Sequence, residues 1–138
     1  MNKELIPILD TKEESEIKEL IYNFRGKEVM LDSDLARLFE VETAQLNRQM
    51  KRNINRFPED FCFKLNSKEL KEQRCQNVTF RESTKNRKYM PFVYTEQGII
   101  AIAGVLKSDI ADEMCVKISR VFVKMKHALI NYAEPLNS

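Results

Sequence analysis

The chain has 138 residues, of which 43% are hydrophobic and 32% are charged, and its formal net charge is +2. This length allows one buried core but is too short for a second, so we expect one domain with a tail. The small net charge does not by itself indicate nucleic acid, and no apolar run reaches the roughly 20 residues of a membrane helix.

The charges are distributed unevenly. Residues 1–20 hold six acids and three lysines, whereas residues 43–56 hold four cations and no acid, so the positive field is expected in the middle of the chain. Cys62, Cys75 and Cys115 form no CxxC pair, which favours a reducing compartment and small buried thiols. The first ten residues lack the order of a signal peptide. We expect a soluble, cytoplasmic protein.

Residues 1–16 are predicted to form an N-terminal arm, either without fixed structure or packed on a partner. Residues 17–31 are predicted to form a short β-hairpin, because Gly26 supplies the positive φ of a tight turn between two apolar stretches. The hairpin leads into a helical region.

Two short helices are expected next, over about residues 33–40 and 43–53. Asp32, Ser33 and Asp34 offer side-chain oxygens to the free N–H groups of the first helix, and Thr43 does the same for the second. The connection between the helices is very tight.

Residues 60–65 alternate as a strand does, with Phe61, Phe63 and Leu65 inward. Asn66 and Ser67 could cap a short helix through residue 71. Residues 78–80 and 91–94 are predicted to be strands that bracket an exposed loop over residues 81–90.

The last third is helical in pattern. Thr95 caps a predicted helix over residues 96–106, and Ser108 caps a longer one to about residue 132. Apolar side chains of the long helix recur at three and four: Ile110, Met114, Ile118, Val121, Met125 and Leu129. Such a stripe is more often core than a dimer seam, and both interpretations stay open.

The fold class is therefore α+β, a helix-turn-helix with short β-hairpins and a long C-terminal helix. We expect an arm over residues 1–16, a domain over 17–106, and a C-terminal helix and tail over 107–138, with residues 108–132 as a candidate homodimer element.

Residues 34–53 have the spacing of a helix-turn-helix. Ala36 is small where the helices cross, Val41 fills the turn, and Leu46 and Met50 anchor the second helix. Glu40 stands where such turns often have Gly, so it must adopt a glycine-like conformation or the turn must take another path. The free face of the second helix carries groups that hydrogen-bond to base edges or phosphate, and we select Thr43, Gln45, Asn47, Arg48, Lys51 and Arg52 as DNA-binding candidates.

A second basic element occupies residues 81–89. On a protruding hairpin, its cations could follow a phosphate backbone or enter a groove as a wing does; a charged surface loop is the alternative. The candidates here are Arg81, Lys85, Arg87 and Lys88, with Asn86 and Tyr89 beside them.

No residues suggest an enzyme, a metal site or a cofactor. His127 is the only histidine and is expected on the surface, so a catalytic triad or a His/Cys zinc site cannot be assembled. The three glycines are too far apart to cradle a phosphate together. Glu13, Glu14 and Glu16 are more typical of a solvated stretch than of acid-base catalysis or a nuclease site.

Five blocks in one order carry a family resemblance: residues 22–31, 34–39, 46–53, 56–63 and 94–99. They resemble the phage "ORF-six N-terminal" DNA-binding domain, which is related to the KilA-N and Bro-N domains of phages and large DNA viruses. The resemblance implies DNA binding in phage or mobile-element regulation, with antirepressor roles in the family. The sequence therefore predicts a non-enzymatic domain that binds double-stranded DNA, and the alternative is an antirepressor module that binds a repressor protein.

Overall fold

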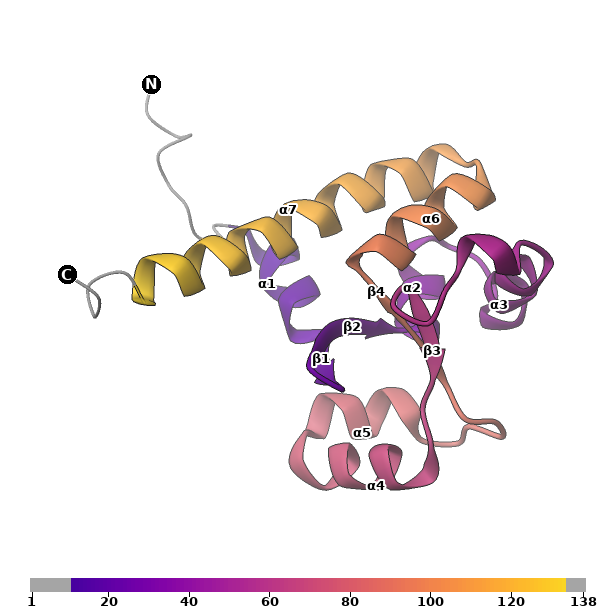
Figure 1. Ribbon diagram of the computed structural model, residues 1–138, viewed down its shortest axis with the longest axis horizontal. Coiled ribbons are helices and arrows are strands. Elements are labelled where there is room, and N and C mark those ends of the chain that lie inside the picture. Colours follow the sequence, from indigo (N-terminus) through magenta and orange to yellow (C-terminus); the bar gives the residue numbers. More distant parts are fainter. Residues whose placement is uncertain (1–10, 134–138) are drawn as a thin grey trace.

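The computed structural model describes residues 11–133, and the side chains up to residue 128. Figure 1 shows a small antiparallel sheet with helices on both of its faces. The strands are β1 (Ile21–Phe24), β2 (Lys27–Leu31), β3 (Cys62–Lys64) and β4 (Phe92–Thr95), in the order β1-β2-β4-β3. The α-helices in the described part are α1 (Lys12–Glu19), α2 (Asp32–Leu38), α3 (Thr43–Arg52), α4 (Ser67–Gln76), α5 (Val78–Thr84), α6 (Glu96–Leu106) and α7 (Asp109–Ala133). The predicted α+β class is confirmed.

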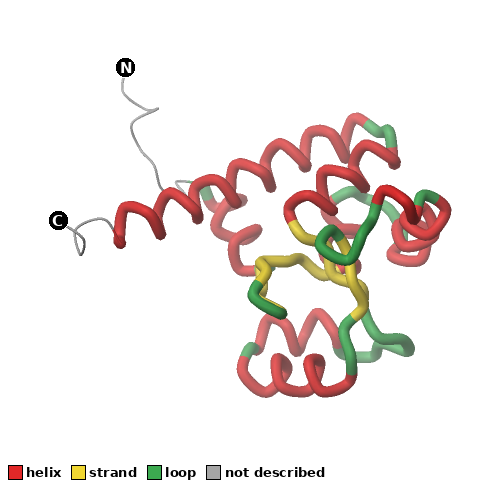
Figure 2. Tube along the Cα trace, in the orientation of Figure 1, coloured by secondary structure: helices red, strands yellow, loops and turns green. Residues whose placement is uncertain are grey.

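The sheet separates two clusters of buried side chains. Met30 and Tyr94, which are paired across β2 and β4, face the larger core formed with α1, α2, α3, α6 and α7. Val29 and Val93 face a smaller core that α5 closes with Phe80. Figure 2 shows the strands lying between these two groups of helices. The alternation of a strand thus assigns neighbouring residues to opposite cores.

The predicted hairpin is present as β1 and β2. Arg25 and Gly26 have φ of 56° and 76°, and the two positive values in a two-residue loop are typical of a type I′ turn. The expectation of a strand from Ile17 onward is wrong, because residues 12–19 form α1. Thr11 caps this helix through Glu14 N–H (3.0 Å), and burial of Ile17 fixes it on the larger core.

α1 also corrects the interpretation of the N-terminal acids as a solvated stretch. Glu14 pairs with Lys124 of α7 at 3.0 Å, and Glu13 pairs with Lys117 at 3.2 Å. Residues 12–16 of the predicted arm therefore belong to the domain, whereas residues 1–10 lie outside the described part.

The predicted strand at residues 78–80 is wrong. These residues begin α5, whose first turn is capped by Asn77 as its Oδ1 accepts from Phe80 N–H at 2.9 Å. The Phe80 ring is fully buried, with its centroid 5.0 Å from Tyr22 and 5.7 Å from Phe24. The wing-like strand-loop-strand is therefore absent from the described residues, and an irregular segment of residues 85–91 leads from α5 to β4.

The helix expected after residue 66 is confirmed and longer than predicted. Asn66 and Glu69 form a reciprocal capping box at the start of α4, which continues to Gln76. In the strand before it, Phe63 and Leu65 are buried as expected, but Phe61 is only half-buried and Cys62 is buried instead.

α2 and α3 form the predicted helix pair, with Ala36, Leu46 and Met50 buried between them and the core. Glu40 has φ of 57°, so a glutamate holds the glycine-like conformation that this turn requires. Val41 N–H donates to Ala36 O at 2.9 Å, which closes the turn.

The N-cap positions of these two helices differ from the prediction. Leu31 and Glu42 occupy the N-cap positions and use no side-chain hydrogen bond, whereas Thr43 is the first residue inside α3. Asp32 nevertheless accepts from one free N–H of the first turn, that of Ser33, at 2.7 Å as expected, and it also has partners outside the helix. Asp34 binds Arg37 and Ser83 instead of a helix N–H.

The last two helices agree with the prediction. Thr95 Oγ1 accepts from Gly98 N–H (3.4 Å) and Ser108 Oγ accepts from Ala111 N–H (3.1 Å), as expected of caps. Most of the apolar stripe of α7 packs inward, with Met114, Ile118 and Val121 buried and Met125 half-buried. Ile110 is 40% exposed. The side chain of Leu129 lies outside the described residues.

Three smaller expectations concern thiols, the histidine and the membrane. Cys62 is buried, which raises the pKa of its thiol to about 12, but Cys75 is exposed and Cys115 only half-buried, so the prediction of three buried thiols is wrong for these two. His127 is exposed, as expected. Among the described helices, none combines the length and the apolar character needed to cross a bilayer.

Candidate nucleic-acid interface

A buried carboxylate, Asp32, lies at the junction of β2 and α2. Its side chain is 0% exposed, and it accepts hydrogen bonds from the backbone N–H groups of Ser33 at 2.7 Å and Phe92 at 3.1 Å. Because a buried charge is costly unless it is paired, these two bonds alone would leave the carboxylate poorly compensated.

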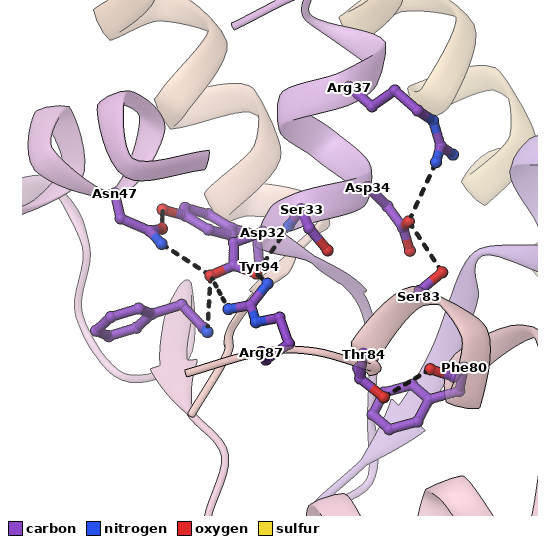
Figure 3. A network of polar contacts seen from close by, with 11 residues as sticks. Asp32, Ser33, Asp34, Arg37, Asn47, Phe80, Ser83, Thr84, Arg87 and Tyr94 are labelled. Atoms are coloured by element: carbon purple, nitrogen blue, oxygen red, sulfur yellow. Dashed lines mark hydrogen bonds and ion pairs between the residues drawn. The ribbon is translucent and has the colours of Figure 1, made fainter. Parts of the chain in front are cut away.

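Arg87 balances this charge from the segment between α5 and β4. Its two terminal guanidinium nitrogens donate to the two oxygens of Asp32 at 3.0 and 3.1 Å, as Figure 3 shows. This bidentate arrangement is the strong form of an arginine-carboxylate pair. Arg87 therefore fastens residues 85–91 to the start of α2.

Asn47 connects the same carboxylate to α3. Its Nδ2 donates to Asp32 Oδ2 at 2.8 Å, and its Oδ1 accepts from the hydroxyl of Tyr94 at 3.0 Å. Burial raises the pKa of Tyr94, so its phenol remains a hydrogen-bond donor at neutral pH. The Asn47 amide thus holds α3 against α2 and β4.

A second buried carboxylate, Asp34, holds the end of α5. Its Oδ1 accepts from Ser83 Oγ at 3.2 Å and lies 3.6 Å from a guanidinium nitrogen of Arg37 (Figure 3). Burial raises the pKa of Asp34 above its usual value. Asp32 thus positions the segment between α5 and β4 by binding Arg87, and Asp34 binds Ser83 at the end of α5 from which that segment begins.

This positioning creates an open groove of about 720 Å³ between α3 and residues 86–92. Its lining includes five cations and no acid: Arg48, Lys51, Lys64, Arg87 and Lys88. Arg87 is paired with Asp32, so the other four supply the positive field of the groove. We call this surface the basic groove.

Phe92 gathers two of these cations at the floor of the basic groove. The ammonium groups of Lys51 from α3 and Lys64 from β3 each lie 5.5 Å from the centroid of its ring. A cation over an aromatic face is held there by the ring quadrupole. Tyr89, which also lines the groove, is 80% exposed and offers a second aromatic surface.

The predicted DNA-binding residues divide into two groups. Six line the basic groove: Thr43, Asn47, Arg48, Lys51, Arg87 and Lys88. The other four lie outside it: Gln45, Arg52, Arg81 and Lys85. Arg81 Nε donates to Arg74 O at 2.9 Å, and Lys85 pairs with Glu82 at 3.0 Å.

Two features of the groove were missed from the sequence. Lys64 is exposed between the buried residues Phe63 and Leu65, so the strand alternation already indicated an outward cation there. The pairing of Asp32 with Arg87 has no local signal, because an aspartate before a helix is also typical of a cap.

These features define the class of the chain: an α+β helix-turn-helix domain whose second helix lines a basic groove. Comparison with family models matches residues 19–105 to the ORF6N domain. The match covers more than half of the chain, which therefore belongs to the phage-associated ORF6N domain family. Neither the comparison with curated proteins nor that with solved structures gave a match.

Proposed function

We propose that this chain is a non-enzymatic regulatory domain that binds duplex DNA in the basic groove. The observation that carries the proposal is the gathering of cations from α3, β3 and the segment before β4 on one surface without an acid. The phosphate backbone of a duplex is a polyanion that such a surface attracts. Membership of a phage-associated family supports the proposal.

In this proposal α3 enters the major groove. At about 1.5 Å per residue, its ten residues span about 15 Å, and a major groove is about 12 Å wide. Arg48 is exposed on its free face and is suited to the bidentate contact with guanine. Lys51, Lys64 and Lys88 are suited to phosphate contacts.

Asn47 and Arg87 receive a different role. Both the nitrogen and the oxygen of the Asn47 side-chain amide form hydrogen bonds inside the protein, and the Arg87 guanidinium is held by Asp32. We therefore assign them to the positioning of α3 and of residues 85–91, whereas Arg48 and Lys51 contact the DNA.

The test is a fluorescence anisotropy titration of a pool of duplexes of random sequence, repeated at several salt concentrations. Arg48→Ala and Lys51→Ala are expected to weaken binding about tenfold, and loss of the Lys51 contact should lower the salt slope by about one. Lys18→Ala, which removes an exposed lysine of α1 outside the basic groove, is the matched control and should bind as the wild type does.

Unchanged affinity of both groove variants would contradict the assignment of the site. Absence of wild-type binding to any duplex, together with retention of a phage or host repressor in a pull-down, would favour the antirepressor function instead.

A further inference from the structure

A second open groove, of about 670 Å³, lies between α6 and α7 and shares no residue with the basic groove. Its apolar lining includes Ile100 from α6 and Val116 and Val123 from α7. These three side chains are 50%, 50% and 46% exposed, although each is of the kind that a core normally buries. We call this surface the α6–α7 groove.

This groove is not the apolar stripe predicted from the sequence. That stripe, which includes Met114, Ile118 and Val121, packs against the rest of the domain. Residues 112, 116, 120 and 123 belong to a different face of α7, because positions three and four apart lie on one side of a helix. The outer face is therefore available after the fold is complete.

The charges on this outer face are segregated along α7. Asp109, Asp112 and Glu113 precede Val116, whereas Arg120 follows it; Lys124, one turn further on, is paired with Glu14 of α1. None of the ion pairs among the described residues includes Asp112 or Arg120, and the two are separated by two helical turns, so they cannot reach each other.

We propose that the α6–α7 groove is the interface of a symmetric homodimer in which two copies of α7 lie antiparallel and cross at Val116. In a two-fold interface each contact occurs twice with the partners exchanged. An antiparallel pairing centred on Val116 places Asp112 of each copy opposite Arg120 of the other, since both are four residues from the centre. A parallel pairing would instead place like charges together.

The apolar side chains complete the match. Val116 of one copy would lie against Val116 of the other at the crossing, and Ile100, which lines the same groove, would be covered, which removes exposed apolar surface that a monomer retains. A Cβ built on Gly104 of α6 meets nothing within 4 Å, so there is room for the second helix to approach this side of the groove. Each dimer would carry two basic grooves.

The test is sedimentation of the full chain by analytical ultracentrifugation, with charge reversals at the proposed pair. The wild type should form a dimer, and Asp112→Arg or Arg120→Asp alone should raise the dimer dissociation constant at least about tenfold, because each brings two like-charge pairs together. An equimolar mixture of the two single variants should form a heterodimer, because every pair is then opposite in charge. The double variant D112R/R120D should form a homodimer again.

Glu72→Arg, an exposed charge reversal on α4, is the control and should remain dimeric. Circular dichroism of each variant establishes that the fold is retained. A monomeric wild type across a wide concentration range would overturn the proposal, and protection of the α6–α7 groove from hydrogen exchange in that monomer would show that the chain covers the groove itself. Single reversals that dimerise like the wild type, or a mixture that stays monomeric, would overturn it equally.

Discussion

Arg87 and Asp32 are 55 residues apart in the sequence, and the guanidinium of the first donates to both carboxylate oxygens of the second at 3.0 and 3.1 Å. The pair joins the segment before β4 to the start of α2, and Asn47 extends the same network to α3. One buried carboxylate therefore sets the distance between the two walls of the basic groove.

Arg87→Ala should lower the free energy of unfolding by about 3 kcal/mol, because it leaves the fully buried Asp32 carboxylate without its counter-charge. Lys88→Ala removes a neighbouring exposed cation and should change stability by less than about 0.5 kcal/mol. Urea unfolding followed by circular dichroism measures both. Equal stability of the two variants would show that the pair does not hold the segment.

Gly98→Ala and Gly104→Ala place the same methyl group at two positions of α6 with opposite results. A Cβ at Gly98 would overlap the carbonyl oxygen of Phe61, whereas one at Gly104 meets open space. We expect the first variant to lose about 2–3 kcal/mol of stability through overpacking and the second to gain about 0.5–1 kcal/mol from helix propensity. Thermal unfolding measures both changes, and a Gly98→Ala variant as stable as the wild type would be inconsistent with the close approach of Phe61 to α6.

Glu40→Gly should stabilise the domain by about 0.5–1 kcal/mol, because Glu40 has φ of 57°, a region that costs a residue with a Cβ. The control is Glu72→Gly, in the interior of α4, which should cost about the same amount through loss of helix propensity. Denaturant midpoints give both values. A destabilised Glu40→Gly variant would rule out strain at this turn.

Asp34 predicts a pH dependence of stability. Burial raises its pKa in the folded state, so at this site the folded chain binds protons more readily than the unfolded chain. The free-energy cost of keeping Asp34 ionised in the folded state is complete above this raised pKa. It vanishes below the pKa of about 3.9 that an aspartate has in the unfolded chain. The wild type should therefore gain stability relative to Asp34→Asn as the pH falls from neutral into the acidic range. Urea unfolding of both proteins at several pH values tests this, and a stability difference that is independent of pH would contradict it.

The sequence predicts those elements whose signals are local. Gly26 indicated the β-hairpin, Thr95 and Ser108 indicated the starts of α6 and α7, and the spacing of Leu46 and Met50 indicated the packing of α3. In each case the residue that carries the signal lies within a few positions of its partner.

The sequence of α5 predicts a strand because Val78, Thr79 and Phe80 are β-branched or aromatic residues that favour strands. Its structure is decided by tertiary contacts instead, since Phe80 packs on Tyr22 and Phe24 more than fifty positions earlier. Only part of the basic groove can be predicted from the sequence, because its other part also depends on tertiary contacts. The cations of α3 follow from the free face of that helix. The opposite side of the groove, formed by residues 86–92, is positioned by Asp32, which is distant in the sequence.

The most direct test of the basic groove compares two lysines that are both exposed and four positions apart. Lys64 lines the groove beside Phe92, and Lys68 lies on α4 outside it. Duplex affinity is measured by fluorescence anisotropy for Lys64→Ala and Lys68→Ala, which have the same net charge. We predict about tenfold weaker binding and a salt slope reduced by about one for Lys64→Ala alone. Equal affinities of the two variants would contradict the proposal that DNA binds in this groove.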